Sequence, residues 1–309
     1  MQDDLLAVVG PTGVGKSALA LKLAGRLGGE IVSADSRQVY RRLDIGTAKP
    51  SPEDRASVPH HLIDIVDPDE DYSLALFLRQ AAEAIQNVTH AGRLPILTGG
   101  TGQYVWGLLE GWQVPEVPPD LELRGILEDR AEREPEALYE ELARLDPAAA
   151  ERIDPRNVRR VIRALEVEKA RAGPRGPHKE TRYRAKLIGL TLERAELYRR
   201  IDERVDAMLA AGWLDEARGL LERGCSSDLP SLSSLGYEEM MRVLRDDMSL
   251  DEAAQRIKFK THQLARRQYA WFRLADPRIH WFDATAGFEP VYAEVSAWMA
   301  ARSSASTTP

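Results

Sequence analysis

Short apolar runs alternate with segments of helical spacing over the first third of the chain. Four runs are each followed at once by a glycine or an acid, which is typical of buried strands: Leu5–Val9, Glu30–Ala34, Leu62–Val66 and Leu94–Thr98. Between them, the spacing predicts a helix over Ser17–Leu27 and another from Ser73 to about His90. Strands that alternate with helices predict an α/β fold, with a parallel sheet covered on both faces.

The pattern changes after Trp112. The proline-rich string VPEVPP is followed by helical spacing alone from about Asp120 to Lys169. Strand character returns over Lys186–Leu192, and the chain is mainly helical from Arg194 onward. We therefore expect a core in two parts, residues 1–118 and 186–309, with a helical domain of residues 119–185 inserted between them.

The turn after the first predicted strand carries the strongest chemical signal, the string GPTGVGKS. It matches the P-loop pattern G-x-x-x-x-G-K-[ST], with a strand before it and a helix after it. Its glycines let backbone N–H groups face phosphate oxygens, Lys16 adds a charge, and Ser17 can bind Mg²⁺. The string predicts a P-loop NTPase-like core, with Ser17 as metal ligand, that binds a diphosphate through Gly10, Pro11, Thr12, Gly13, Val14, Gly15, Lys16 and Ser17.

Two more turns follow predicted strands and carry polar groups. Asp35 opens the string DSRQVY, and it can accept a proton, bind Mg²⁺ or simply close an Asx turn. Thr101 lies in TGGTGQY, where two glycines allow close approach of the backbone to a ligand, although a plain strand-to-helix turn has the same composition. Because ligands bind at the carboxyl ends of parallel strands, we expect these turns to converge on the P-loop.

The distribution of charge along the chain favours binding of a polyanion. The chain carries a net charge of −7, yet residues 152–186 hold twelve Lys or Arg against four acids, and residues 255–273 hold six against none. Two such segments suit a nucleic acid, the alternative being solvated helix faces. The single cysteine, Cys225, excludes an internal disulfide. With no signal-peptide pattern and no apolar run near the ~18 residues of a membrane span, we expect a cytoplasmic protein without a membrane segment.

Four strings occur along the chain in this order: GPTGVGKS, DSRQVY, DIGTAKP and GGTGQY. In their order and spacing, they resemble the tRNA dimethylallyltransferase family of bacterial-type tRNA isopentenyltransferases. The resemblance continues through PHHLID, NVRRVIRALEV, RIDERV, LGYEE and QLARRQYAWFR, so it covers nearly the whole chain. It implies transfer of a dimethylallyl group from dimethylallyl diphosphate, with Mg²⁺, and release of pyrophosphate. The implied acceptor is N6 of adenosine 37, next to the anticodon, in tRNAs that read codons beginning with U.

The resemblance also implies roles for single residues. Asp35 matches the family's general base, Thr101 a threonine that positions amine and diphosphate, and Arg204 an arginine that contacts the diphosphate. From the sequence alone, Arg204 would be a surface residue of a helix. The residues implied to contact the tRNA anticodon stem-loop are Asp35, Ser36, Arg37, Gln38, Thr101, Arg124, Arg159, Arg160, Val161, Ile162 and Arg163. Over Ser233–Glu238 the chain lacks basic residues that some relatives carry, so no contact is assigned there.

We expect the tRNA-modifying enzyme to be a monomer. Three alternatives to this function remain open. A small-molecule kinase would use the same loop on ATP, and the basic residues after Arg152 would form a lid. An isopentenyltransferase acting on free adenine nucleotides would share the P-loop and the DSRQVY string. An RNA-binding protein with an inactive loop would not need Lys16, Ser17, Asp35 and Thr101.

Overall fold

The computed structural model describes residues 3–115, 117, 120–170 and 182–305. All six strands run parallel in one sheet with the order β3-β2-β4-β1-β5-β6. The strands are β1 (Asp3–Val9), β2 (Gly29–Ser33), β3 (His60–His61), β4 (Leu94–Thr98), β5 (Tyr183–Thr191) and β6 (Ile279–Asp283). The predicted α/β class is confirmed.

At the edges of the sheet, one predicted strand was wrong and one strand was not predicted. Leu62 and Asp64 adopt positive φ angles of 63° and 58°, so the apolar run that begins at Leu62 is not a strand. The edge strand is instead the short β3 just before it. The other edge strand, β6, was not predicted because His280 and Asp283 interrupt the apolar residues of its string IHWFD; only Ile279 is buried.

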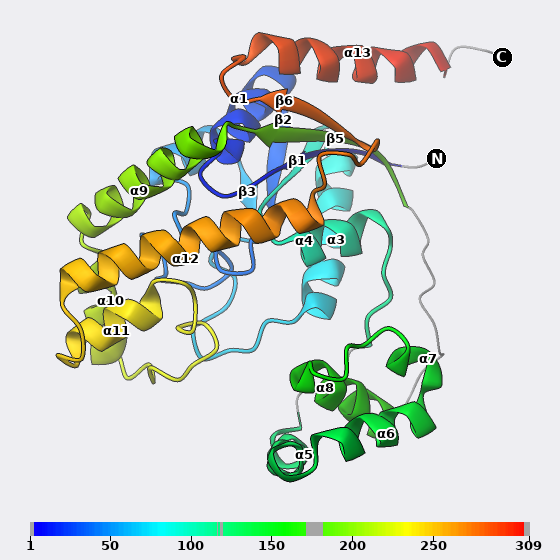
Figure 1. Ribbon diagram of the computed structural model, residues 1–309. Helices are drawn as coiled ribbons and strands as arrows, with labels where there is room; N and C mark the ends of the chain where they lie inside the picture. Colours follow the sequence, from blue (N-terminus) through cyan, green and yellow to red (C-terminus); the bar gives the residue numbers. More distant parts are fainter. Residues whose placement is uncertain (1–2, 116, 118–119, 171–181, 306–309) are drawn as a thin grey trace. The chain divides into compact units, whose positions relative to one another are not determined.

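Side chains of alternate strand residues enter two separate cores, one on each face of the sheet. On one face Leu5, Ala7 and Val9 pack with α3 (Leu74–His90) and α4 (Gly102–Leu109). On the other face Leu6 and Val8 pack with α1 (Lys16–Leu27), α9 (Arg194–Ala210) and α13 (Glu289–Ala305). This alternation follows from the two-residue period of a strand. Figure 1 shows α1 and α13 near the sheet on the latter face.

A third core joins α9 to α10 (Trp213–Glu222), α11 (Tyr237–Leu244) and α12 (Leu250–Trp271), and α9 and α12 lie side by side (Figure 1). Trp213 is its largest fully buried side chain. The indole lies between two glycines, since a Cβ at Gly46 or Gly236 would be 2.2 Å or 2.0 Å from it. Trp213 therefore ties this lobe to the loop that follows β2.

Residues Gln113–His178 form a compact unit of their own, set apart from Met1–Trp112 and Lys179–Pro309. Its helices are α5 (Leu121–Arg133), α6 (Pro135–Leu145), α7 (Pro147–Ala150) and α8 (Val158–Lys169), and α2 (Pro52–Ser57) completes the helices of the larger unit. The smaller unit buries its own apolar core around Leu127, Leu142 and Leu165. Within the described residues, no helix is both long and apolar enough to cross a membrane.

Candidate active site

The carboxyl ends of three adjacent strands, β2, β4 and β1, deliver the three predicted turns to one place. A cavity of about 530 Å³ opens there, within the larger unit. Nine of the residues predicted from the sequence line it: Thr12, Lys16, Ser17, Asp35, Ser36, Arg37, Gln38, Thr101 and Arg204. The expected convergence of the turns follows from the strand order, because neighbouring parallel strands end at the same edge.

The P-loop runs from β1 into α1 and presents its lysine to this cavity. Gly15 caps α1 in a left-handed conformation, with φ 103°. The Lys16 ammonium donates to the Pro11 carbonyl at 2.7 Å, and only 9% of the residue is exposed. Burial and the nearby charge of Arg204 lower the pKa of Lys16, Asp35 partly offsets them, and the resulting pKa is about 7. An anion bound in the cavity would restore the charge of Lys16.

Arg204 reaches the P-loop from α9, where its guanidinium donates to the Thr12 hydroxyl at 3.3 Å. Burial lowers its pKa, and Asp35 raises it. Among the described residues, no acid forms an ion pair with it. Arg204 is thus not the surface residue that its helix position suggests; it is a second cation in the cavity, and the charge of Asp35 acts on it.

The cavity wall formed by residues 35–38 and Thr101 is held by a network of hydrogen bonds. Asp35 Oδ1 accepts the backbone N–H of Arg37 at 2.9 Å, which is the Asx turn that the sequence allowed. Thr101 Oγ1 accepts the backbone N–H of Ser36 at 3.1 Å and lies 3.3 Å from the Ser36 hydroxyl. The Gln38 side chain bonds to the Ser33 hydroxyl and to the carbonyls of residues 47 and 48. These bonds hold Asp35 and Gln38 at the cavity wall.

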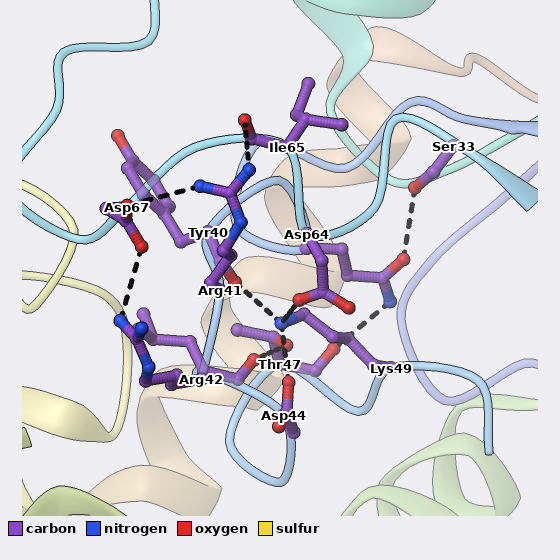
Figure 2. A network of polar contacts seen from close by, with 12 residues as sticks. Ser33, Tyr40, Arg41, Arg42, Asp44, Thr47, Lys49, Asp64, Ile65 and Asp67 are labelled. Carbon is purple, nitrogen blue, oxygen red and sulfur yellow. Dashed lines mark hydrogen bonds and ion pairs between the residues drawn. The ribbon is translucent and has the colours of Figure 1, made fainter. Parts of the chain in front are cut away.

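The long loop behind Gln38 is fixed by two charged anchors. The Lys49 ammonium donates to Asp44, Asp64 and the Tyr40 carbonyl, each at 2.6 Å, and its side chain is 3% exposed (Figure 2). Opposite it, the Glu216 carboxylate accepts three successive backbone N–H groups, those of residues 44 to 46, and the Tyr237 hydroxyl. The loop therefore keeps its shape without regular secondary structure.

Six residues of α12 line the cavity, and none of them was predicted as a site residue from the sequence; Gln268 and Trp271 are two of them. Gln268 bonds to Thr12 and to Gly100, so it touches two of the converging turns. Trp271 packs on the start of α4, where a Cβ at Gly102 would lie 2.3 Å from the ring. Both belong to the string QLARRQYAWFR, which marked the family resemblance, but helical spacing does not say which residues face a ligand.

The remaining predicted RNA contacts lie in the smaller unit and differ in exposure. Arg159 and Arg160 are exposed, and no acid pairs with them among the described residues. Val161 and Ile162 are 2% and 4% exposed, so their side chains belong to the core of the unit. Arg124 and Arg163 both pair with Glu166, a fully buried carboxylate that also accepts the Asp120 backbone N–H at 2.6 Å. Only Arg159 and Arg160 are unpaired cations of this set.

The donor set at the cavity fits a magnesium ion that arrives with a diphosphate. Ser17 is exposed and lines the cavity with Asp35, and hydroxyl and carboxylate oxygens are ligands that Mg²⁺ prefers. The described residues hold no group of three or more His, Cys, Asp or Glu that could bind a metal on its own. Phosphate oxygens and water would therefore have to supply most of the ligands, as is usual for Mg²⁺.

Comparison with known proteins identifies the family. A family model described as IPP transferase matches residues 38–275, and one described as Isopentenyl transferase matches residues 3–64. A tRNA dimethylallyltransferase of Roseiflexus castenholzii is 57% identical over 273 residues, which cover 87% of this chain and 89% of that protein. The chain belongs to the IPP transferase family of tRNA dimethylallyltransferases.

Solved structures of the family share the fold. The tRNA isopentenylpyrophosphate transferase of Bacillus halodurans is 41% identical, with a TM-score of 0.71 and coverage of 97% of this chain and 96% of that one. A eukaryotic dimethylallyltransferase described as acting on tRNA is 27% identical, with a TM-score of 0.81 over 99% of this chain and 80% of that one. The predicted family, its prenyltransferase class and the P-loop fold with an inserted helical domain are confirmed.

The pKa of Lys16 leads to a test of the phosphate site. At pH 8 Lys16, with a pKa of about 7, is mostly neutral in the free protein, and a bound diphosphate should make it take up close to one proton. The affinity for inorganic pyrophosphate should therefore fall as pH rises above 7. Calorimetry in buffers of different ionisation enthalpy measures the uptake. The Lys16→Arg variant, which stays charged, corrects for protons taken up by pyrophosphate itself; equal uptake by both proteins would contradict the prediction.

Proposed function

We propose that this protein transfers the dimethylallyl group of dimethylallyl diphosphate to N6 of adenosine 37 in tRNA and releases pyrophosphate. The observation that carries the proposal is a single cavity that holds both halves of the chemistry. The cavity is lined by the P-loop cation Lys16 and by Arg204 of α9, and also by the Asp35 carboxylate and the Thr101 hydroxyl. The names of the relatives, tRNA dimethylallyltransferases, support the same donor and acceptor.

The donor half of the cavity suits a diphosphate leaving group. In the reaction the bond between the prenyl carbon and the diphosphate oxygen breaks, so negative charge grows on pyrophosphate. Lys16, Arg204 and the P-loop amides would stabilise that charge, and the burial of Lys16 strengthens its interaction with a phosphate. Mg²⁺, held through Ser17, would neutralise further phosphate charge. The apolar cavity residues Ile201, Met208 and Trp213 offer a surface for the dimethylallyl chain.

The acceptor half suits an exocyclic amine, which is a weak nucleophile until it loses a proton. As the new bond between N6 and the prenyl carbon forms, one N6 proton would pass to the Asp35 carboxylate. Its Oδ1 already accepts the Arg37 N–H, and no described residue bonds to Oδ2. Thr101 supports this geometry by holding Ser36, the next residue along the chain.

The adenine must leave the anticodon loop to enter a cavity of this size, and unpaired loop bases are read in this way. Residues Asp35 to Gln38 would contact the base and its neighbours. Arg159 and Arg160, exposed and unpaired within the described residues, would bind backbone phosphates. Glu166 would keep Arg124 and Arg163 in place for the same surface. We place the reaction in the cytoplasm and expect one chain to suffice.

The direct test is label transfer from dimethylallyl diphosphate, with Mg²⁺, to an anticodon stem-loop with adenosines on the 3′ side of the loop. We expect label on the stem-loop and none on AMP or ATP run in parallel. Label on AMP would move the acceptor to free nucleotides. If no acceptor takes the label and ATP donates phosphate instead, the protein is a kinase and the proposal is wrong.

Replacing Asp35 by alanine should slow turnover by about 10²–10⁴-fold, the usual size of a general-base effect, with little loss of RNA binding. Single-turnover transfer and anisotropy of a labelled stem-loop measure the two quantities. Asp251→Ala, an exposed acid at the start of α12, is the matched control. Unchanged turnover in Asp35→Ala would remove this carboxylate from the mechanism.

Reversing the charge of Arg159 and Arg160 together should weaken stem-loop binding and reduce its dependence on salt. Each lost phosphate contact lowers the slope of log affinity against log salt by about 0.7–0.9. Binding is followed from about 50 to 200 mM salt, the range where this term dominates. Arg133→Glu together with Arg144→Glu, at exposed arginines of α5 and α6, makes the same change in net charge and is the control. A slope equal to that of this control would mean that the RNA binds elsewhere.

A further inference from the structure

The Gln268 side chain spans two loops of the cavity. It comes from α12, and only 6% of the residue is exposed. Its Oε1 accepts the backbone N–H of Thr12 in the P-loop at 2.7 Å, and its Nε2 donates to the Gly100 carbonyl at 2.9 Å. One amide thus satisfies a backbone donor of the donor-side loop and a backbone acceptor of the acceptor-side loop.

We propose that Gln268 is a positioning residue that keeps the diphosphate loop and the 99–101 loop at a fixed separation. The inference rests on the proposed function, since it concerns the meeting of donor and acceptor. In the part of the chain that the structure describes, no direct hydrogen bond joins residues 10–17 to residues 99–103. The shared amide is therefore the polar link between them.

The amide has little freedom to move. Gly100 leaves just enough room for it, since a Cβ there would lie 2.3 Å from Nε2. Ala265 of the same helix and Phe272, the residue directly after its end, are fully buried in the two cores on either face of the sheet, so the backbone is held on both sides of Gln268. Turning the amide by 180° would set its NH₂ against the Thr12 N–H and its oxygen against the Gly100 carbonyl, so only one orientation satisfies both loops.

The link extends into the reacting groups on both sides. The Thr12 hydroxyl also accepts a hydrogen bond from Arg204. Gly100 precedes Thr101, whose hydroxyl accepts the backbone N–H of Ser36, the neighbour of Asp35. Moving one loop against the other would shift the leaving group relative to the base. A displacement of about 1 Å between reacting groups can cost on the order of 100-fold in rate. Gln268 touches neither group directly in this arrangement, so its effect should appear in turnover and not in donor binding.

Kinetics of two variants test the first consequence. Gln268→Met keeps the length of the side chain and removes both bonds; kcat should fall about 10- to 100-fold, with the KM for dimethylallyl diphosphate changing less than about threefold. Gln268→Glu restores both bonds only when protonated, which burial favours. Its kcat relative to wild type should therefore rise as pH is lowered from about 8 to 6. Gln255→Met, an exposed glutamine of the same helix, should behave as wild type.

Hydrogen exchange tests the link without catalysis. When inorganic pyrophosphate binds the wild-type P-loop, exchange should slow in peptides covering residues 10–17 and also 98–105. In Gln268→Met only the first peptide should be protected. Protection of both peptides in Gln268→Met would overturn the proposal, and so would a wild-type kcat in that variant. The proposal would also be wrong if Gln268→Met lowered both kcat and thermal stability and the kcat of Gln268→Glu did not rise at low pH. If the wild-type protein transfers no label, the proposed function fails, and the exchange result still decides the role of Gln268.

Discussion

The close approach of backbone at the ends of β2 and β4 is the constraint on which the site depends. The Ala34 N–H donates to the Thr98 carbonyl at 2.8 Å, and the Ala34 carbonyl accepts the Thr101 N–H at 3.3 Å. A Cβ at Gly99 would lie 2.2 Å from that carbonyl, so only glycine allows the contact. Because Asp35 follows Ala34 directly, the contact fixes the carboxylate and the Thr101 hydroxyl together. The P-loop joins them because β1 is the next strand of the sheet.

Charge makes the cavity ready for an anion at the expense of stability. Lowering the pKa of Lys16 from 10.5 to about 7 corresponds to roughly 5 kcal/mol of disfavoured charging. Arg204 is half-buried near it, and the charge of Asp35 opposes both. A diphosphate bound in this site would offset the cost of burying the Lys16 charge. Its ion pairs with Lys16 and Arg204 would also be stronger than the same pairs in water. In the smaller unit, Arg159 and Arg160 are exposed and have no acidic partner among the residues that the structure describes, while buried Glu166 neutralises Arg124 and Arg163 in part.

Between β2 and α3 the chain has little regular structure, yet it forms much of the cavity wall. Its backbone groups must find other partners, because an unpaired buried polar group is costly. Lys49 satisfies one carbonyl and two carboxylates, and Glu216 satisfies three N–H groups. Removing one partner of such a buried ionic cluster costs about 3–5 kcal/mol, although the exposed part of Asp44 reduces its share. In this segment, hydrogen bonds with the Lys49 and Glu216 side chains satisfy backbone groups that strand pairing would satisfy in a sheet.

The sequence by itself determined the parts of the protein that depend on neighbours along the chain. The P-loop, the turns at Asp35 and Thr101, and the central strands follow from local patterns, and so does the resemblance that the comparisons confirmed. The edge strands did not, because β3 is only two residues long and His280 interrupts the short apolar string of β6. Only the tertiary structure decided that Arg204 and Gln268 reach Thr12 from positions 192 and 256 residues away, and that Glu166 pairs with Arg124. Such contacts depend on how helices pack against the sheet, and helical spacing shows which residues share a face but not what that face meets.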